Sequence, residues 1–450
     1  MTPTVHVIGA GLAGCEAAYI AARLGCHVLL HEMKPQKYSP AHHNPDFCEL
    51  VCSNSLRSNQ LSNAVGLLKA ELHTLSSLIM EAAYATEVSA GSALAVDRTL
   101  FARYVTDKIR NHPRITVIEE EVVTLPENAI TVVATGPLTS DALSESLKAI
   151  IPEASLHFYD AAAPIVDAST INTDIAFAAS RYGKGEACYL NCPMTREEYE
   201  AFYEALITAE EAKLHEFDTA DKNGNKLTVF EGCMPVEVMA RRGKETLLFG
   251  PLKPVGLPDP KTGKEYHAVV QLRRENNAAT MYNLVGFQTH LTFGEQKRVF
   301  RMIPGLENAE FLRYGVMHRN TFINSPKLLD ASYAMKNNPH LFFAGQMTGV
   351  EGYIESASSG YVAGLNAALT ALGKDACVFP DTSAIGALAH YVSSATSQFQ
   401  PMNVNFGIIA PLDHKVKGGK AARNEALSQR ALSVVEAIFR NNIESGFVDC

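Results

Sequence analysis

Features that would mark a membrane-spanning, secreted or repeat protein are missing from this sequence of 450 residues. No apolar run reaches the ~18 residues that a transmembrane helix requires, so we expect no membrane span. The first residues lead directly into an apolar strand, without a basic region or a cleavage site, which predicts that no secretion signal is present. The sequence also contains no internal repeats and no low-complexity segment.

Cysteine and positive charge are both present, but not in the patterns of a metal site or a nucleic-acid coat protein. The nine cysteines are odd in number and scattered, and no pair of histidines accompanies them at zinc-ligand spacing. We therefore expect free thiols in a cytoplasmic protein, and no bound metal. The net charge of −9 argues against general coating of nucleic acid, but it leaves room for a local basic surface.

The bulk composition is that of a folded protein with more than one domain. Hydrophobic residues make up 47% of the chain and charged residues 19%, as in soluble globular proteins. At about 150 residues per domain, the length predicts two or three domains.

The most informative stretch lies at residues 5–32, where an apolar run leads into a glycine-rich turn, an alanine-rich helix and a second strand. Gly9 permits the turn, Gly11 lets the backbone approach a pyrophosphate, and Gly14 lets helix and strand pack closely. The helix start offers unpaired N–H groups to the phosphates. Glu32 ends the second strand and can accept hydrogen bonds from a ribose. The order of these features predicts a dinucleotide site that includes Gly9, Ala10, Gly11, Leu12, Ala13, Gly14 and Glu32.

Two later segments indicate that the dinucleotide is FAD. A strand ending in Ala134, Thr135 and Gly136 returns the chain to the nucleotide domain, and a strand within 341–367 leads into a glycine-rich turn and a small-residue helix. NAD enzymes of the Rossmann type lack these two segments. We therefore predict an α/β protein with a discontinuous, Rossmann-type FAD-binding domain. The further predicted cofactor contacts are Gly345, Gln346, Gly349, Glu351, Tyr353 and Ser356.

The change of composition along the chain predicts an inserted α+β domain. We expect the first part of the FAD-binding domain at 1–150, the inserted tRNA- or substrate-binding domain at 151–325, and the second part of the FAD-binding domain with C-terminal helices at 326–450. Within these parts we expect a long loop at 36–62 and helices at 63–84, 98–112 and 417–440. The segments KLTVFEG and ETLLFG are expected to be short strands of the insert.

Two cysteines are candidate nucleophiles. Cys52 lies in ELVCSNSLRS and Cys233 in FEGCMPVE, both polar and turn-like settings. A free cysteine is most often a buried, small apolar residue, but a thiol near a cation can be a reactive thiolate. Their separation along the chain argues against a Cys-x-x-Cys redox pair and so against a simple disulfide reductase.

Over nearly its whole length the sequence resembles the bacterial folate- and FAD-dependent tRNA (uracil-5-)-methyltransferases, the TrmFO family, which is related to the GidA flavoproteins. The segments ELVCSNSLRSN and FEGCMPVE separate it from GidA, which shares VGFQT, GEQKRVF, HRN and AGQ and has a longer C-terminal extension. The other segments that carry the resemblance are GAGLAGCEAA, HEMKP, MHRNTFINSPKLL and FFAGQMTGVEGYIESASSG.

The resemblance implies methyl transfer without S-adenosylmethionine. The carbon would come from 5,10-methylenetetrahydrofolate, reduced FAD would be the electron donor, and NAD(P)H would regenerate it. The product would be 5-methyluridine at position 54, in the T-loop of tRNA. Elementary chemistry agrees, because a thiolate added at carbon 6 makes carbon 5 of uracil nucleophilic, after which another group must remove the carbon-5 proton.

The resemblance also implies roles for single residues. Cys233 would be the uracil nucleophile, and Cys52 would lie near the flavin as proton acceptor or as guard of the one-carbon unit. Tyr353 would stack on the folate or flavin ring or pack in the core. The candidate RNA-phosphate ligands are Arg241, Arg242, Arg273 and Arg274, and the candidate base-stacking residues are Tyr182 and Tyr189.

Two alternatives stay open at this point. A flavin-regulated RNA-binding protein without catalysis would bind tRNA equally well after Cys233→Ala. A flavin oxidoreductase acting on a small molecule would not involve RNA. The sequence predicts neither the oligomeric state nor a preference for NADH or NADPH.

Overall fold

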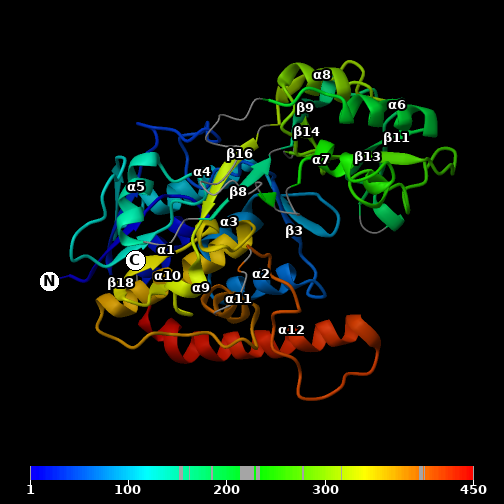
Figure 1. The fold of residues 1–450 in the computed structure, drawn as a ribbon. Helices are drawn as coiled ribbons and strands as arrows, with labels where there is room; N and C mark the ends of the chain where they lie inside the picture. The colour runs from blue at the N-terminus through cyan, green and yellow to red at the C-terminus, as the bar shows by residue number, and fades with distance from the viewer. Residues whose placement is uncertain are drawn as a thin grey trace.

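The computed structural model describes residues 2–151, 156–161, 163–183, 186–212, 228–229, 234–275, 278–315, 317–394, 399 and 401–448. Within this part of the chain, Figure 1 shows two lobes, and the smaller one, coloured green, lies at the upper right. Each lobe has its own buried hydrophobic core. The core of the larger lobe combines residues from both ends of the sequence, whereas that of the smaller lobe draws on residues from Val166 to Ala309.

The larger lobe is built on a sheet of the order β17-β18-β7-β1-β2-β6. All neighbouring strands are parallel except the edge pair β17 and β18. Neighbours far apart in sequence, such as β7 and β18, require the crossovers of a doubly wound fold. The strands are β1 (Thr4–Ile8), β2 (His27–Glu32), β6 (Ile115–Glu119), β7 (Thr131–Val133), β17 (Ala334–Met335) and β18 (Asn338–Phe343).

Two helices of small residues, α1 (Leu12–Arg23) and α10 (Tyr353–Ala371), pack directly on each other beside this sheet. An added Cβ at Gly360 would lie 2.2 Å from the carbonyl oxygen of Ala13, and one at Gly364 would lie 2.4 Å from the Cα of Ala17. The two backbones therefore touch at positions where only glycine fits. This contact joins the first and last parts of the FAD-binding fold.

The helices expected at 98–112 and 417–440 are present, as α4 and α12, and α5, α9 and α11 were not predicted. The expected stretch at 63–84 forms two helices rather than one, because Ser76 takes a left-handed φ of 58° between them and Ser77 caps the second through its side chain. The helices are α2 (Ala64–Thr74), α3 (Leu78–Ala85), α4 (Arg98–Arg110), α5 (Asp141–Ile150), α9 (Ser325–Leu328), α11 (Ala384–Ser393) and α12 (Gly419–Ile438). None of the helices in the described ranges is both long and apolar enough for a membrane span.

The smaller lobe holds a second sheet of the order β10-β11-β13-β14-β9-β15, whose neighbouring strands are antiparallel. Its helices are α6 (Arg196–Ile207), α7 (Val236–Arg241) and α8 (Phe293–Phe300). The strands are β9 (Ile165–Asp167), β10 (Phe177–Ala179), β11 (Tyr189–Met194), β13 (Ala268–Arg274), β14 (Met281–Leu284) and β15 (Phe311–Arg313).

One strand predicted for the insert is wrong. The segment ETLLFG contains a 3-10 helix, η5 (Thr246–Phe249), closed by turn hydrogen bonds from Thr246 to Gly243 and from Gly250 to Leu247. Glycines on both sides allow the chain to turn, and only Leu247 is buried. Of KLTVFEG, only β12 (Thr228–Val229) is described and forms a strand, and the rest of the segment lies outside the described residues.

Two small sheets complete the fold. The sheet β12-β8-β16, with β8 (Leu156–Ala161) and β16 (Met317–Phe322), lies between the two lobes in Figure 1. The sheet β3-β5-β4 consists of β3 (Ser55–Ser58), β5 (Ala93–Val96) and β4 (Glu87–Val88). The strand β3 interrupts the loop expected at 36–62. The domain boundaries at 150 and 325 stay predictions.

A buried carboxylate makes the stability of the larger lobe depend on pH. Glu71 in α2 is fully buried, and its two oxygens accept hydrogen bonds from the backbone N–H groups of Ala384 and Ile385, each at 2.8 Å. These N–H groups open α11 and favour the charged form. Burial outweighs them and raises the pKa of Glu71 from 4.5 to about 7.

The folded chain therefore holds a proton on Glu71 at pH values between these two pKa values, where the unfolded chain releases it. The resulting stabilisation, ~3 kcal/mol, is complete below the unfolded pKa and is lost as the pH rises through the folded pKa. We expect Glu71→Gln to flatten the fall in melting temperature between about pH 5 and pH 8. Thermal melts of both chains across this range test it, with the exposed Glu87→Gln as control, and parallel wild-type and Glu71→Gln curves would contradict it.

Candidate active site

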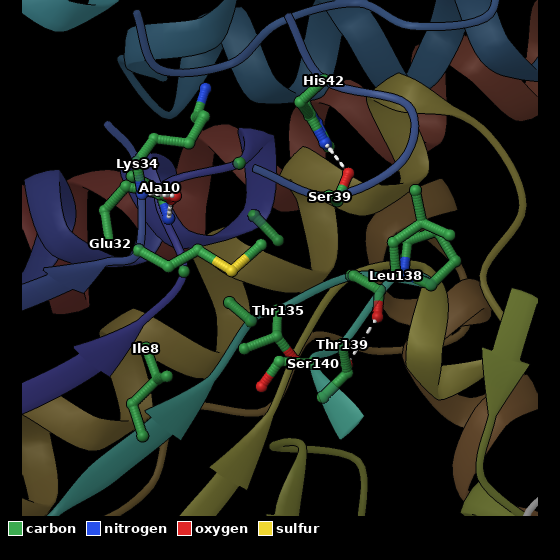
Figure 2. A pocket seen from close by; sticks show the side chains of 18 of the residues that line it. Ile8, Ala10, Glu32, Lys34, Ser39, His42, Thr135, Leu138, Thr139 and Ser140 are labelled. Carbon is green, nitrogen blue, oxygen red and sulfur yellow. Dashed lines mark hydrogen bonds between the residues drawn. The ribbon is translucent and has the colours of Figure 1, made fainter. Parts of the chain in front are cut away.

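A deep pocket lies at the carboxyl ends of the parallel strands, where open α/β sheets bind their ligands. It has about 1170 Å³ of empty space, including its open mouth. Ile8 ends β1 and Glu32 ends β2, while Thr135 and Gly345 follow β7 and β18. Figure 2 shows side chains from these strand ends arranged around the pocket. Four strands thus contribute to one cavity.

The three glycines of the first turn differ in what they permit. Gly9 has a φ of +96°, and an added Cβ would lie 2.7 Å from the carbonyl oxygen of Ala134. A Cβ at Gly14 would lie 1.7 Å from the carbonyl oxygen of Gly9. A Cβ at Gly11 would meet no atom within 4 Å. The chain's own packing therefore requires Gly9 and Gly14, whereas Gly11 leaves open space at the start of α1, where a ligand can approach.

Glu32 lies at the pocket wall and holds the glycine-rich turn in place. Its Oε2 accepts a hydrogen bond from the backbone N–H of Ala10 at 2.8 Å, which Figure 2 shows, and its Oε1 accepts one from Lys34 N–H at 3.0 Å. Gly11, the N-cap of α1, provides no side-chain cap. The first N–H groups of α1 are therefore not satisfied by a capping side chain, which suits an anionic ligand.

The opposite wall comes from the two later segments of the FAD-binding fold. Thr135 and Thr139 share a hydrogen bond of 2.6 Å between their hydroxyls. Gly345 has a φ of +81°, and its N–H donates to the Ser359 hydroxyl at 2.7 Å. The helix α10 then begins at Tyr353 after the uncapped Gly352. Segments from three distant parts of the sequence therefore form one pocket.

Most of the predicted cofactor residues line this pocket. They are Gly9, Ala10, Gly11, Leu12, Ala13, Glu32, Ala134, Thr135, Gly136, Gly345, Gln346, Tyr353 and Ser356. Gly14, Gly349 and Glu351 are not among the lining residues, and their role as direct cofactor contacts stays a prediction. Gly14 packs under the turn, Gly349 has a φ of +85° against the ring of Phe399, and Glu351 accepts a hydrogen bond from Gln346 at 3.1 Å.

Sequence reasoning missed a second group of lining residues, which come from loops. The segment 31–51 contributes a hydrogen bond of 2.5 Å between Ser39 and His42, visible in Figure 2, and Lys34, which donates to the carbonyl oxygens of Asn44 and Asp46. The length of the loop at 36–62 indicated that this segment was functional, but it did not show which of its residues line the pocket. The missed lining residues include His31, Met33, Lys34, Ser39, His42, Cys48, Glu49, Val51, Glu120, Glu121, Pro137, Leu138, Thr139 and Ser140.

Cys52 lies beside the pocket, in a loop that both lobes hold. Val51 lines the pocket, while Asn54 is fully buried and donates through its amide to the carbonyl oxygen of Arg274 at 2.8 Å. The guanidinium of Arg273 donates to Asn54 Oδ1 at 2.9 Å and to Ser53 Oγ at 2.5 Å. The segment Cys52-Ser53-Asn54 is therefore fixed at the junction of the FAD-binding lobe and the strand β13.

Tyr353 connects this loop to the pocket. Its hydroxyl oxygen accepts hydrogen bonds from the backbone N–H groups of Cys52, at 2.8 Å, and Ser53, at 3.1 Å. Burial and the neighbouring Cys52 raise the pKa of Tyr353. Its hydroxyl therefore stays protonated near neutral pH and retains a hydrogen to donate. Tyr353 lines the pocket, so its contact with the Cys52 backbone places the cysteine loop beside the site.

The other predicted residues lie in the smaller lobe or outside the description. Cys233 falls outside the described residues, one position before Met234. Arg273 is buried in the contacts given above, so it is not open to an RNA phosphate, which corrects that prediction. Arg241 is exposed and pairs with Glu211, and Arg242 is exposed as well. Tyr182 is exposed, and Arg274 and Tyr189 are half-buried.

Comparisons with known proteins agree with this fold. Residues 4–375 match the family model described as glucose inhibited division protein A. The fold is similar to a solved structure of Aquifex aeolicus GidA, with a TM-score of 0.69 and 18% sequence identity. The match covers 99% of this chain and 74% of the GidA chain. A second crystal form gives a TM-score of 0.67 at 19% identity, over 98% of this chain and 79% of that one. At this level of identity, the likeness shows the fold.

Curated relatives are much more similar in sequence. The methylenetetrahydrofolate--tRNA-(uracil-5-)-methyltransferase TrmFO of Acetivibrio thermocellus is 61% identical over 97% of this chain and 98% of its own length. The protein of the same name from Listeria monocytogenes serotype 4b is 58% identical over 97% of this chain and 99% of its own length. Together with a pocket built from three distant segments and the cysteine-bearing loop beside it, these similarities show that the chain belongs to the TrmFO family within the GidA group.

Proposed function

We propose that this chain is a folate- and FAD-dependent tRNA (uracil-5-)-methyltransferase that forms 5-methyluridine at position 54 of the T-loop. The observation that carries the proposal is a dinucleotide pocket lined by Tyr353, whose hydroxyl holds the backbone of the adjacent Cys52 loop, in a chain about 60% identical to curated TrmFO proteins. The carbon donor is 5,10-methylenetetrahydrofolate, and NAD(P)H provides the reducing equivalents. Because the proposed substrate is tRNA, we place the reaction in the cytoplasm.

The residues of the pocket fit FAD. Gly11 leaves open space next to the uncapped start of α1, which suits a pyrophosphate. Glu32 has its carboxylate at the carboxyl end of β2, where a ribose hydroxyl is expected. The uncapped start of α10, beside Gly345 and Tyr353, would face the flavin ring. When bound, FAD supplies the two electrons that turn a transferred methylene group into a methyl group.

The chain's own residues would perform the remaining steps. The thiolate of Cys233 adds to carbon 6 of the uracil, and carbon 5 then attacks the one-carbon unit. Cys52 takes the proton from carbon 5, and the bond between the one-carbon unit and its carrier nitrogen breaks. As the methylene group left on carbon 5 is reduced to methyl by two electrons, the bond between carbon 6 and the Cys233 sulfur breaks and restores the ring. Tyr353 holds the Cys52 loop through two backbone hydrogen bonds, which fixes the thiol relative to the pocket.

The experiment that tests the function follows the carbon atom. Purified protein is incubated with unmodified tRNA, NADPH and methylenetetrahydrofolate labelled in its methylene carbon. We expect the label in 5-methyluridine at position 54, and no transfer from labelled S-adenosylmethionine. Label from S-adenosylmethionine, or no label in RNA from a protein that contains FAD, would contradict the proposal.

For the tRNA we propose a surface on the smaller lobe, between residues 241 and 264. This segment has six Lys or Arg residues against two Asp or Glu residues, in a chain whose net charge is −9. Phe249 is 83% exposed, and Tyr182 is 59% exposed with its ring against Gly256. Arg181 fixes this loop through the carbonyl oxygens of Lys253 and Val255. Exposed rings among cations suit unstacked bases and phosphates.

This surface gives a prediction about affinity. Replacing Phe249 with alanine removes a ring that packs against little of the folded chain, so the melting temperature should stay unchanged. If the ring stacks on a base, tRNA binding should weaken about tenfold. Leu100→Ala, at a residue 51% exposed on α4 of the other lobe, is the matched control. Equal dissociation constants for the Phe249→Ala and Leu100→Ala proteins, measured by filter binding, would contradict the placement.

A further inference from the structure

A guanidinium beside the Cys52 loop has no hydrogen-bond or ion-pair partner among the described residues. Arg313 ends β15, and its Nη2 atom is buried without a hydrogen bond. Neither a hydrogen bond nor an ion pair of its side chain occurs with any residue in the described ranges. A buried, unpartnered guanidinium nitrogen is costly, because it has lost water without gaining an acceptor. A group of this kind requires an explanation.

Arg313 lies next to the candidate site. Tyr353, Glu49 and Cys52 are all close enough to interact with it electrostatically, and the first two of these line the pocket. Arg98 is a cation that also acts on it. Burial, followed by Arg98, lowers the pKa of Arg313, but the guanidinium stays charged at neutral pH. Its charge is therefore present at the edge of the pocket where the two lobes meet.

The acidic groups of this region are already engaged. Glu275 forms an ion pair with Arg98 at 2.6 Å. Glu49 uses its Oε2 to accept hydrogen bonds from the backbone N–H groups of His43 and Asn44, both at 3.0 Å. Arg98 also donates to the carbonyl oxygen of Leu50 at 2.8 Å. Arg98 is thus paired with a carboxylate in direct contact, whereas Arg313 forms no ion pair with any carboxylate of the described ranges.

The backbone that carries Arg313 is rigid. Phe311 and Tyr314, on either side of it, stack on each other with ring centres 5.4 Å apart, and Tyr314 also stacks on Phe293 at 4.7 Å. Gln296 then clamps Gly315 by accepting from its N–H at 2.7 Å and donating to its carbonyl oxygen at 2.8 Å. A side chain mounted in this way is pre-organised for a ligand and does not need to fold over one.

We propose that Arg313 binds an anionic oxygen of a substrate at the junction of the two lobes. A guanidinium matches the geometry of a carboxylate or a phosphate, and both occur in the substrates of the proposed function, on which this inference rests. The carboxylate would be that of the glutamate in the folate donor. The phosphate would be one next to the target uridine.

The test compares ligand-free stability with binding, using the FAD-containing protein. Because the Nη2 atom of Arg313 is buried and no described residue accepts a hydrogen bond from it, Arg313→Gln should leave the melting temperature of the ligand-free protein unchanged or raise it. A purely structural arginine would lower it. The same variant should bind one substrate at least about tenfold more weakly. Arg313→Lys keeps the charge and should recover part of the affinity, and Arg298→Gln, at an exposed ion pair of α8, is the control.

Three probes identify the source of the oxygen: tetrahydrofolate, tetrahydropteroate, which lacks the glutamate, and unmodified tRNA. Weaker binding of tetrahydrofolate with unchanged binding of tetrahydropteroate assigns the folate carboxylate. Weaker binding of tRNA alone assigns a phosphate. If wild type methylates tRNA but Arg313→Gln binds all three probes as wild type does, the inference about Arg313 is overturned and the proposed function stands. If wild type binds neither tetrahydrofolate nor tRNA, both are overturned.

Discussion

Cys233→Ala should form no measurable 5-methyluridine, a loss of at least about a hundredfold, while keeping its bound FAD. Without the thiolate, carbon 5 of uracil stays a poor nucleophile, and a correctly bound carbon donor has nothing to react with. The product is measured by mass spectrometry of digested tRNA, and FAD by its visible absorption. Binding of tRNA should change by less than about threefold, because the thiol acts in the chemical step.

The control for this prediction is Cys377→Ala. Cys377 is half-buried in the loop after α10, where its backbone forms hydrogen bonds with the side chain of Asn366. It does not line the pocket and does not belong to the junction of the two lobes. This variant should keep its activity. If Cys233→Ala retained more than about a tenth of the wild-type rate, its role as nucleophile would be refuted. If the wild-type protein showed no turnover and Cys233→Ala bound tRNA as tightly as wild type, the non-catalytic RNA-binding alternative would gain support.

Gly360→Val should prevent the larger lobe from closing. Its first added carbon would lie 2.2 Å from the carbonyl oxygen of Ala13, an atom of the α1 backbone that no rotamer change can move. Separating α1 from α10 displaces the strand ends that form the pocket. We expect a loss of more than about 3 kcal/mol in unfolding free energy, together with loss of bound FAD. Denaturant unfolding and the absorption of the purified protein measure the two effects.

A second glycine shows whether the effect depends on position. Gly294 lies in α8 of the smaller lobe, and an added Cβ would meet no atom within 4 Å. Gly294→Ala should leave FAD content unchanged and raise stability slightly, by ~0.5 kcal/mol, because alanine favours the helix. A Gly360→Val protein as stable and as yellow as the Gly294→Ala protein would show that the helix contact is not needed for the pocket.

Local patterns made much of this fold predictable. The order of strand, glycine turn, helix and carboxylate at 5–32 fixed the first unit, because each residue has a separate physical task within a short stretch. Gly9 and Gly14 are required by close packing of the backbone, and Gly11 leaves open space for a ligand, as that motif requires. The helices α4 and α12 were also accessible, since their apolar spacing depends only on neighbours in sequence.

Contacts between distant segments were not predictable in the same way. Arg273 was expected on an RNA-binding surface from its charge, yet its guanidinium bonds to Ser53 and Asn54, which lie 220 and 219 positions away from it in the chain. Phe249 was placed in a strand, but flanking glycines and a single buried leucine made a 3-10 helix. Arg313 drew no attention, because its isolation depends on which acids its neighbours already occupy. Such features follow from tertiary structure and leave no local pattern.

The direct contact of α1 with α10 also sets an order of events during synthesis. The helix α1 lies near the N-terminus, and its partner begins at Tyr353. A ribosome must therefore translate the whole smaller lobe before the glycine face of α10 becomes available. Until then, the apolar side of β1 and α1 is exposed on a growing polypeptide, and the smaller lobe, with its own core, can fold first. We expect truncated chains that end before Tyr353 to be held by chaperones and to contain no flavin.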